Sequence, residues 1–584
     1  MSSKPADTVN VPAMLVDSKK NVLYERLRFF GKGGYAVCFK IKDTKTDKIF
    51  AGKIVSKSLL IKEHNQREKL TQEMMIHQTL DHKNIVKFLS FFEDAINIYI
   101  VLELCENRSM MELHQRRRVI TDYECRFYMY QILEGVKYLH ENNIIHRDLK
   151  LGNLFLNDQL NVKIGDFGLA TRIEFDGERK KTLCGTPNYV APEVLTEIGH
   201  SFEADIWSIG CVMYALLVGR PPFETKTLRE TYRKIKMCDY KMPKIVCPSA
   251  TEMIIAMLQS NPQKRPCANK LLHFDFIKGH HIPSFLPSSC LTMAPRSHEV
   301  EGGEREIGHN RNPLMGLIQH IGSRLFMKMN PADENAGDTF LQKNLNDSIT
   351  ACGSVATNVE YKSDVESLLK QLTIMFNSKP RKNVSLDSEE NTDPAAQPLF
   401  WVSKWVDYSD KYGFAYQLCD DGIGVMFNDT TKLIVLANGI DVHFIDKDGT
   451  ESYMTTAAYP TEMAKKMKLL TYFKSFMTEL LSKAGGSVKV EQSDVVSRIP
   501  HMHAWFRTTC AAVMHLTNGS VQFNFNDHVK IILCPRMSSV TYINNSSFRT
   551  YRFSTIQERG LTKDLYQKLR YAHEKLKTLL QKIS

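Results

Sequence analysis

Three short motifs in the first half of the chain bring acidic, amide and basic side chains together. They are His146-Arg147-Asp148-Leu149-Lys150-x-x-Asn153, Asp166-Phe167-Gly168 and Ala191-Pro192-Glu193. A carboxylate such as Asp148 can take a proton from a hydroxyl group, and the oxygens of Asn153 and Asp166 suit Mg²⁺ held against phosphates. Lys150 can steady a phosphoryl group. Each residue alone could be an ordinary polar loop residue, but their order and spacing favour phosphoryl transfer.

A glycine-rich stretch near the N-terminus adds a candidate phosphate cradle. Gly31-x-Gly33-Gly34 lies between two strand-like runs, where missing Cβ atoms let a backbone close over phosphates. Alone, this pattern is equally typical of a glycine turn in a hairpin. Lys53, on the next predicted strand, can hold the α and β phosphates, and Glu73, on the following predicted helix, can orient it. The alternative for Lys53 is a solvated surface lysine.

The elements that must position these residues change character along the chain. Short β-branched and aromatic runs at 37–41, 49–55 and 98–104 predict strands, with a helix near 66–80 between them. Thr121-x-x-Glu124 is a capping box, and the apolar spacing after it predicts a long helix. A second apolar helix is expected at 204–218. A strand-rich lobe followed by a helix-rich lobe therefore ends near residue 277.

Residues 24–277 resemble a eukaryotic protein kinase domain in these motifs. His146 to Asn153, and Gly185-Thr186-Pro187 before Ala191-Pro192-Glu193, resemble serine/threonine kinases and disfavour tyrosine specificity. The resemblance implies ATP and Mg²⁺ as cofactors, with adenine bound to the backbone of Glu103 and Cys105. It also implies the catalytic residues Asp148, Lys53, Lys150 and Glu73 and the metal ligands Asn153 and Asp166. The expected ATP-binding set is Gly31, Lys32, Gly33, Gly34, Tyr35, Ala36, Cys38, Lys53, Glu103, Cys105, Asn153 and Asp166.

Two loop residues depart from the kinase pattern. Ala36 stands where a third glycine is usual, and Cys38 stands where valine is usual. Ala36 should stiffen the loop slightly. Because the motif residues are all present, an inactive pseudokinase is disfavoured.

Thr182 is the expected activation phosphosite. It lies between Asp166-Phe167-Gly168 and Ala191-Pro192-Glu193, after Lys180 and Lys181. A phosphate there would add about −1.5 to −2 charge, and Arg147 could pair with it and order the segment. An upstream activating kinase is therefore an expected partner. The alternative is a solvated loop threonine.

The second half of the chain contains an internal repeat. Phe427-Asn428-Asp429-x-x-Lys432 recurs 98 residues later as Phe525-Asn526-Asp527-x-x-Lys530. Both copies are strand-like first and helical afterwards, so two β-then-α modules are expected at 398–482 and 498–580. Between kinase and repeats, 278–397 has the composition of a linker, with one helix at about 363–376 introduced by Ser363-x-x-Glu366. Residues 1–23 are expected to be a flexible segment.

His528 and Lys530 form a candidate anion site in the second module. If they lie on one strand, their side chains share a face and can converge on one anion. The first module has Thr430 and Lys432 in the matching places and lacks this pair, which predicts one anion site for two modules. A surface lysine beside an incidental histidine is the alternative, favoured on spacing alone.

The whole arrangement closely resembles the polo-like kinases. The sequence Trp401-Val-Ser-Lys-Trp405-Val-Asp407-Tyr-Ser-Asp-Lys-Tyr-Gly opens the first module, and the kinase region with the two repeats covers about three-quarters of the chain. The predicted fold class is thus α+β: a bilobal eukaryotic protein kinase domain, a linker and two polo-box β-then-α modules. The resemblance implies a mitotic serine/threonine kinase whose polo boxes dock phosphoserine or phosphothreonine proteins.

Further expectations follow from this resemblance. It implies phosphopeptide contacts from Trp405, Asp407, Leu481, His528 and Lys530, and a helix at 363–376 that caps the first polo box. It implies a place in cytoplasm and nucleus, at centrosome, kinetochore, spindle and midbody. Glu106-Asn107-Arg108 replaces the consecutive arginines usual in the family, and the linker contains no convincing match to the family's destruction signal.

Composition and charge narrow the class of partner. The chain has 584 residues, 13 scattered cysteines without a Cys-x-x-Cys pair, no apolar run as long as a membrane span and no apolar signal segment. We therefore expect an intracellular protein with reduced thiols and no membrane insertion. Of the net charge of +11, residues 498–584 carry +9, from 13 basic and 4 acidic side chains. This charge lies on the module with His528 and Lys530, so phosphoproteins are favoured over nucleic acid.

Two other functions are alternatives to the kinase. One is a phosphopeptide-binding scaffold with incidental catalysis, which an Asp148→Asn substitution would distinguish. The other is a nucleic-acid binder, suggested only by the net charge of +11.

Overall fold

The computed structural model describes residues 11–33, 36–62, 66–296, 358–378, 391–480, 497–545 and 547–583. Contacts divide the chain into two units. The first contains the described parts of Met1–Met293, Asn358–Leu399 and Ala504–Ser584, and the second those of Ala294–Thr357 and Phe400–His503. Each unit is described by itself.

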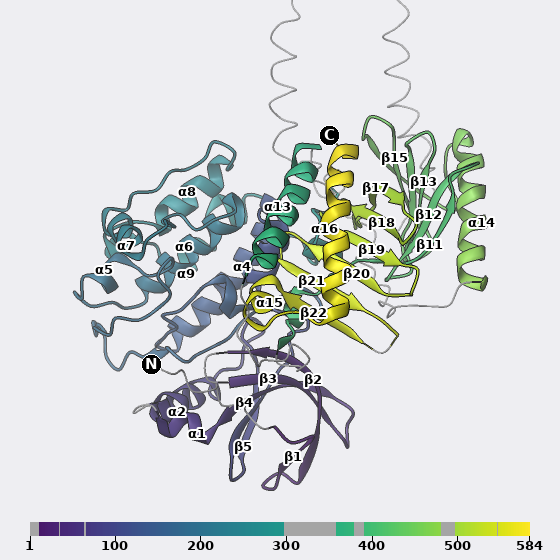
Figure 1. Ribbon diagram of the computed structural model, residues 1–584. Coiled ribbons are helices and arrows are strands. Elements are labelled where there is room, and N and C mark those ends of the chain that lie inside the picture. Colours follow the sequence, from purple (N-terminus) through teal and green to yellow (C-terminus); the bar gives the residue numbers. More distant parts are fainter. Residues whose placement is uncertain are drawn as a thin grey trace, which may run out of the picture. The chain divides into compact units, whose positions relative to one another are not determined.

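The N-terminal lobe of the first unit is an antiparallel sheet with two helices (Figure 1). Its strand order is β1-β2-β3-β4-β6-β5. The elements are β1 Met14–Asp17, β2 Val22–Lys32, β3 Ala36–Asp43, β4 Ile49–Ser56, α1 Lys57–Lys62, α2 Gln66–His77, β5 Phe88–Glu93 and β6 Asn97–Leu102. The predicted strands and helix are confirmed. The expectation of a flexible segment over 1–23 is wrong for residues 14–17, because β1 pairs with β2 and buries Leu15.

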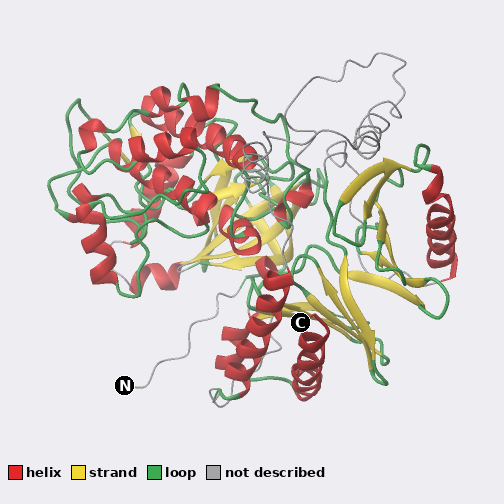
Figure 2. Ribbon diagram, turned by 90° about the horizontal axis from the view of Figure 1, so that it is seen from above, coloured by secondary structure: helices red, strands yellow, loops and turns green. Residues whose placement is uncertain are grey.

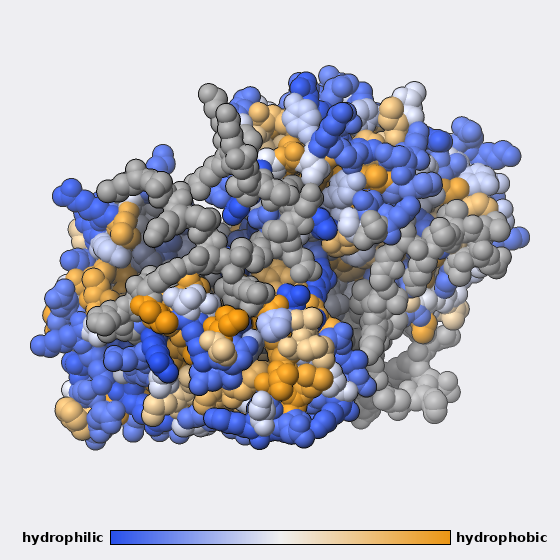
Figure 3. Space-filling model, turned by 60° about the horizontal axis from the view of Figure 1, so that its bottom comes forward, coloured by the Kyte–Doolittle hydropathy of each residue, from blue (hydrophilic) through white to orange (hydrophobic). Residues whose placement is uncertain are grey.

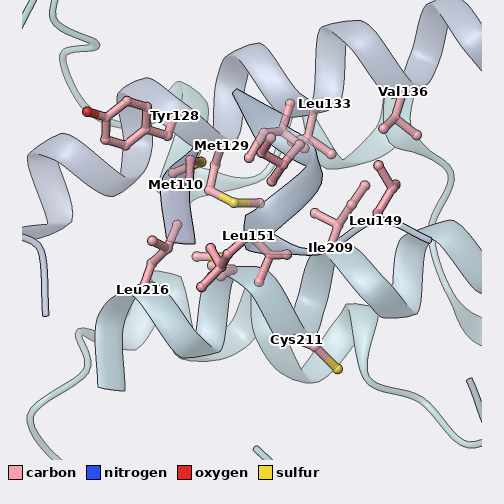
Figure 4. Close-up of a cluster of buried hydrophobic side chains, with 14 of the residues drawn as sticks. Met110, Tyr128, Met129, Leu133, Val136, Leu149, Leu151, Ile209, Cys211 and Leu216 are labelled. Carbon is pink, nitrogen blue, oxygen red and sulfur yellow. The ribbon is translucent and has the colours of Figure 1, made fainter. Parts of the chain in front are cut away.

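The second lobe is mainly helical. Its elements are α3 Met110–Arg117, α4 Asp122–Glu141, β7 Ile144–Ile145, β8 Leu154–Leu156, β9 Val162–Ile164, β10 Thr171–Arg172, α5 Pro192–Leu195, α6 Glu203–Val218, α7 Leu228–Met237, α8 Pro248–Met257, α9 Ala268–Leu271 and α10 Asp275–Lys278. Thr121 and Glu124 form the predicted capping box of α4. Figure 4 shows Leu133 and Val136 of α4 near Ile209 of α6, with Leu149 and Leu151 in the same apolar cluster.

The helical lobe continues past the predicted boundary at residue 277. Leu286, Cys290 and Leu291 are buried in its core. The guanidinium of Arg117 donates hydrogen bonds to the carbonyl oxygens of Cys290 and Met293. The stretch after 277 that composition assigned to a linker therefore packs as kinase-lobe structure up to Met293.

The first repeat forms an antiparallel sheet in strand order β11 to β16, with one long helix on a face of it. Its elements are β11 Val402–Tyr408, β12 Gly413–Leu418, β13 Ile423–Phe427, β14 Lys432–Val435, β15 Asp441–Ile445, β16 Glu451–Thr455 and α14 Ala464–Leu480. Val425, Leu433 and Val442 alternate with outward residues and pack against Phe473 and Met477 of α14. Figure 2 shows this helix beside its sheet.

The second repeat has the same strand order and helix. Its elements are β17 Met502–Arg507, β18 Ala511–Leu516, β19 Val521–Phe525, β20 Lys530–Cys534, β21 Ser539–Ile543, β22 Phe548–Arg552, α15 Phe553–Arg559 and α16 Lys563–Ile583. The predicted pair of β-then-α modules is confirmed.

The helix before the repeats is α13, Asn358–Phe376. Its buried residues Val365, Leu368 and Leu372 join the core of the second repeat, and α13 lies beside α16 in Figure 1. The expectation that this helix caps the first polo box is therefore wrong. Ser363 also lies inside α13 rather than at its start, because the helix begins five residues earlier than the capping-box pattern indicated.

The second unit contains a buried polar cluster around Glu451 and Tyr453 of β16. Glu451 accepts hydrogen bonds from the Tyr453 hydroxyl and Arg498, both at 2.5 Å. The Arg296 guanidinium lies 3.8 Å from the centroid of the Tyr453 ring and donates to the Ser497 carbonyl oxygen at 3.3 Å. Residues 296 and 498, distant in sequence, are thus joined at β16.

Candidate functional site

A cavity of about 930 Å³ lies under the glycine-rich turn between β2 and β3. The predicted ATP-binding residues that line it are Gly31, Lys32, Gly33, Ala36, Cys38, Lys53, Glu103, Cys105, Asn153 and Asp166. Gly34 and Tyr35 lie outside the described residues. The structure therefore brings the described part of this set to one cavity.

Lys53 and Glu73 form an ion pair inside this cavity. The Lys53 Nζ is 2.5 Å from Glu73 Oε1, which joins the middle of β4 to α2. Burial alone would lower the pKa of Lys53, but the carboxylates of Glu73 and Asp166 outweigh it and raise that pKa. The ammonium thus stays charged where a phosphate would lie, and a solvated surface lysine is excluded.

The segment after β6 offers one backbone acceptor and one donor to the cavity. The Glu103 N–H is already used, because it donates to the Lys87 carbonyl oxygen at 2.9 Å. Its carboxylate is held by Lys163 at 2.7 Å. Within the described chain, the Glu103 carbonyl and the Cys105 N–H have no backbone partner. An adenine ring presents one donor and one acceptor on one edge, so this pair suits it.

The Asp148 carboxylate is held by three donors. Oδ2 accepts from Lys150 Nζ at 2.6 Å and from the Asn153 amide at 3.0 Å. Oδ1 accepts from the Thr186 hydroxyl at 2.7 Å. These three hydrogen bonds fix the position of the carboxylate beside Asn153, which lines the cavity.

Asp205 holds the backbone of the residues just before Asp148. Its carboxylate accepts from the backbone N–H groups of His146 and Arg147, both at 2.9 Å, and from His140 Nε2 at 3.0 Å. Burial would raise the pKa of Asp205, but these donors and the histidines lower it. Sequence reasoning missed this residue. A single carboxylate inside the apolar run of α6 was the available signal, because buried charges are rare unless paired.

Asn153 and Asp166 present oxygen atoms to the cavity. The Asn153 amide nitrogen donates to the Asp148 carbonyl at 2.8 Å, so its side-chain oxygen is not used in this bond. Asn153 lines the cavity. The Asp166 side chain is exposed, and no described residue hydrogen-bonds its carboxylate. Phe167 beside it is buried against His77 and His146, with ring centroids 4.6 and 5.2 Å away. This packing holds Asp166 at the cavity.

Arg108 is a cavity residue whose role sequence reasoning missed. Its guanidinium carbon lies 3.4 Å from the centroid of the Phe30 ring, and it donates a hydrogen bond to the Phe30 carbonyl oxygen. Burial lowers the pKa of Arg108 to about 10, so it remains a cation at neutral pH. Phe30 directly precedes the glycine turn, so Arg108 fixes the base of that turn. In the sequence, Arg108 is distinctive only because Glu106-Asn107-Arg108 replaces the consecutive arginines usual in the family.

Thr182 is exposed on the segment between β10 and α5. Arg147, its expected phosphate partner, has φ of 67° and donates from Nε to the Leu169 carbonyl at 2.6 Å. Lys180, two residues before Thr182, pairs with His200 in an isolated bridge. The threonine hydroxyl is therefore accessible to another enzyme.

In the second repeat, His528 and Lys530 do not share a strand. His528 is exposed in the turn before β20 with φ of 66°, and the strand begins at Lys530. The prediction that both side chains project from one strand face is wrong, because the turn reverses the chain there. Burial lowers the pKa of Lys530 to about 8. Asn524 pairs with Lys530 across the ladder, so both side chains lie on the face opposite α16.

In the first repeat, Trp405 and Asp407 lie on β11. The Trp405 ring stacks on Phe414, with centroids 5.7 Å apart. Asp407 accepts hydrogen bonds from the Ser409 backbone N–H at 3.0 Å and hydroxyl at 2.6 Å. These two belong to the second unit, whereas His528 and Lys530 belong to the first. Leu481 lies outside the described residues.

Comparisons with known proteins agree with this architecture. A protein kinase domain family matches residues 24–277, and a POLO box duplicated region matches 410–467 and 508–569. The chain is 63% identical to serine/threonine-protein kinase polo of Drosophila melanogaster, over all of both chains. It is 48% identical to serine/threonine-protein kinase PLK1 of Xenopus laevis over 98% of this chain and 93% of that one. With serine/threonine-protein kinase plk-2 of Caenorhabditis elegans the identity is 44%, over 98% and 90%.

Proposed function

Because the chain belongs to the polo-like kinase family and is a serine/threonine protein kinase with a polo-box region, we propose specific roles for its residues. Asp148 accepts the proton of the substrate serine or threonine hydroxyl as the γ-phosphoryl group of ATP is transferred. Lys150 steadies that phosphoryl group. The observation that carries this proposal is the Asp148 carboxylate, which is held by Lys150, Asn153 and Thr186. Of these, Asn153 lines the cavity that contains the Lys53–Glu73 pair.

The nucleotide lies between the glycine turn and the connector after β6. Lys53, oriented by Glu73, holds the α and β phosphates, and the backbone of Gly31, Lys32, Gly33 and Ala36 covers them. The Glu103 carbonyl accepts from the adenine amino group, and the Cys105 N–H donates to a ring nitrogen. Cys38 and Ala36 line the cavity wall.

Mg²⁺ is held by the side-chain oxygens of Asn153 and Asp166. Mg²⁺ is commonly bound through one or two protein ligands together with substrate phosphates and water. The two free oxygens fit this pattern. Among the described residues no group of three His, Cys, Asp or Glu side chains gathers as a metal site, so the ion is expected to bind with the nucleotide. When bound, Mg²⁺ would neutralise part of the negative charge of the phosphates.

Thr182 is the site at which an upstream kinase activates the enzyme. The exposure of Thr182 supports access by that kinase. Arg147 is the cation expected to pair with the phosphate. Arg147 is also the neighbour of Asp148 in the chain. A phosphate on Thr182 that pairs with Arg147 would therefore help to fix the position of the proton acceptor.

The polo-box region recruits proteins that already carry phosphoserine or phosphothreonine. His528 and Lys530 bind the phosphate, while Trp405, Asp407 and Leu481 contact the flanking peptide. The exposed imidazole of His528 and the excess of basic residues in 498–584 support this role. We further propose that the kinase acts in mitosis at centrosome, kinetochore, spindle and midbody, with proteins rather than nucleic acid as partners. No helix in the described chain is long and apolar enough to cross a membrane.

One pair of variants of the full chain tests the kinase against the scaffold alternative. Asp148→Asn should lower the rate of phosphate transfer from ATP to a serine peptide by about 10²–10⁴-fold, because the proton acceptor is lost. Binding of a phosphoserine peptide should be unchanged. Asp158→Asn, at an exposed loop position nearby, is the matched control.

The combined substitution His528→Ala and Lys530→Ala should have the opposite effect. It should abolish phosphopeptide binding while transfer to a free peptide continues. Full activity of Asp148→Asn would refute the catalytic assignment. Normal division of cells that carry only Asp148→Asn would instead favour the scaffold.

A further inference from the structure

The first repeat contains a lysine in the same place as the lysine of the second. Lys432 is the first residue of β14, and Lys530 is the first residue of β20. Lys432 pairs with Met426 on one side and Ile445 on the other, as Lys530 pairs with Asn524 and Ile543. Both lysines therefore project from equivalent points of equivalent sheets.

The turn before each lysine has the same backbone conformation. Thr430 has φ of 71° and donates its N–H to the Phe427 carbonyl at 2.9 Å. His528 has φ of 66° and donates its N–H to the Phe525 carbonyl at 3.1 Å. A non-glycine residue with positive φ is uncommon, so its repetition means that the whole turn is shared. Thr430 thus occupies the backbone place of His528.

Lys432 lies on the face of its sheet that is not covered by α14. Its neighbour Leu433 is buried against that helix, so alternation directs Lys432 to the opposite face. Lys432 is half-buried, and burial lowers its pKa. No described residue forms a hydrogen bond or ion pair with its ammonium. A cation withdrawn from water without a partner is costly, and an arriving anion would remove that cost.

The groups around Lys432 favour an anion. Burial, together with the charges of His443 and Lys432, lowers the pKa of His501, and burial together with the charge of Lys432 lowers the pKa of His503. Neither imidazole therefore adds a negative charge near Lys432. Two acidic residues lie in the same cross-strand row as Lys432: Glu451 on β16 and Asp407 on β11. Glu451 is bound by Tyr453 and Arg498 and faces His443 at 3.2 Å, and Asp407 accepts hydrogen bonds from the backbone N–H and hydroxyl of Ser409. Both carboxylates therefore already have partners other than Lys432.

We propose that Lys432, with Thr430 in the place of the second repeat's histidine, forms a second oxyanion site in the first repeat. Its ligand is a phosphoryl or carboxylate group carried by a bound protein. The site goes beyond the phosphopeptide site at His528 and Lys530 and replaces the sequence-based expectation of one anion site for two modules. Because a neutral hydroxyl replaces an imidazole that can become cationic, the site binds more weakly than its counterpart.

The test measures the acylation rate of each lysine in the full-length protein by mass spectrometry. Three capped peptides, containing phosphoserine, glutamate or serine at one position, are added at millimolar concentration and constant ionic strength. An anion that pairs with the ammonium raises its pKa, and each unit of increase lowers the reactive neutral fraction about tenfold. We expect Lys432 to react roughly three to ten times more slowly with an anionic peptide than with the serine peptide. Exposed Lys447 is the internal control and should not change.

Each outcome decides the proposal. Protection by the phosphoserine peptide alone identifies a phosphoryl ligand, and equal protection by the glutamate peptide identifies an acidic side chain. An unchanged Lys432 rate with both anionic peptides overturns the site. Protection that disappears in the Lys530→Met variant also overturns it, because Lys432 would then only sense the other site. The rate at Lys530 reports the phosphopeptide site separately, so failure of one does not imply failure of the other.

Discussion

At the scale of single residues, Asn153 shows how one side chain serves two neighbours. Its amide nitrogen donates to the Asp148 carboxylate at 3.0 Å, and Asn153 itself lines the cavity together with Asp166. One side chain therefore holds the proposed proton acceptor and supplies a proposed ligand for Mg²⁺. Asn153→Asp keeps the side-chain oxygen but loses the N–H donor. It would place a second carboxylate beside that of Asp148, and the two negative charges would repel each other.

Arg108 gives the first prediction at this scale. Arg108→Ala should raise the KM for ATP about three- to tenfold, because a charge-assisted hydrogen bond and a cation–π contact worth roughly 1–2 kcal/mol are lost below the glycine turn. The kcat should change little, since Asp148 and Lys53 are untouched. Steady-state kinetics with varied ATP measure both constants. Lys83→Ala, at an exposed site of the same lobe, is the control, and an equal rise in KM there would contradict the assignment.

His77 gives a prediction about pH. It is buried beside Phe167, and burial lowers its pKa to about 4. Between pH 6.5 and 4 the unfolded chain binds a proton that the folded chain does not, so stability falls as pH falls through this window. At pH 5.5 the loss from this residue is about 1.4 kcal/mol relative to pH 7.5. His77→Leu should remove that part of the pH dependence.

The measurement is the free energy of unfolding by denaturant at both pH values. The control is His280→Leu, because the His280 side chain is half exposed. The assignment is refuted if wild type and His77→Leu lose equal stability between pH 7.5 and 5.5.

At the scale of elements, α13 shows where sequence reasoning reached its limit. The apolar spacing of Val365, Leu368 and Leu372 predicted a helix with a buried face. Periodicity identifies the face but not the surface that covers it, and here the cover is the second repeat rather than the first. The prediction that His528 lies on a strand was wrong for a related reason. His528 is a non-glycine residue with positive φ, and the spacing of apolar residues does not reveal such a conformation.

The kinase motifs were predicted more completely than the docking residues. The types and order of Lys53, Glu73, Asp148, Asn153 and Asp166 match the kinase pattern. The structure places all of them except Asp148 in the wall of one cavity, and Asn153 donates a hydrogen bond to Asp148. Asp205 and Arg108 act on backbone groups of other segments. Such contacts depend on tertiary packing, which the sequence does not display locally.

The contact between α13 and the second repeat can be measured. Leu372→Ala should destabilise this module by about 2–5 kcal/mol, because Leu372 is fully buried in its core. Ile374→Ala on the same helix should have little effect, because Ile374 is 52% exposed. Hydrogen exchange of the strands β18 to β21 in the full chain reports the change. Loss of protection confined to the first repeat would contradict the observed packing.

At the scale of the whole molecule, charge is divided unevenly along the chain. Residues 498–584 carry +9 of the total +11, while the first repeat is acidic overall. Figure 3 shows one face of the molecule, on which hydrophilic side chains surround several apolar patches. Electrostatic attraction of phosphoproteins therefore belongs to one end of the chain and catalysis to the other.

This division predicts different responses to salt. Raising the ionic strength from about 0.05 M to 0.5 M should weaken phosphoserine-peptide binding several-fold, because salt screens the attraction between the basic residues of 498–584 and the phosphate. The kcat on a short uncharged serine peptide at saturating ATP should change less than twofold. Fluorescence anisotropy and a phosphate-transfer assay measure the two quantities. Equal salt sensitivity of both would contradict the separation.

The contact of Arg296 with Tyr453 and Ser497 also has a mechanical consequence. Together with the bond from Arg498 to Glu451, it closes a loop of about 200 residues without a covalent link. A force that pulls residue 296 away from residue 498 is therefore carried by these contacts around β16 before it reaches the other strands of the first repeat.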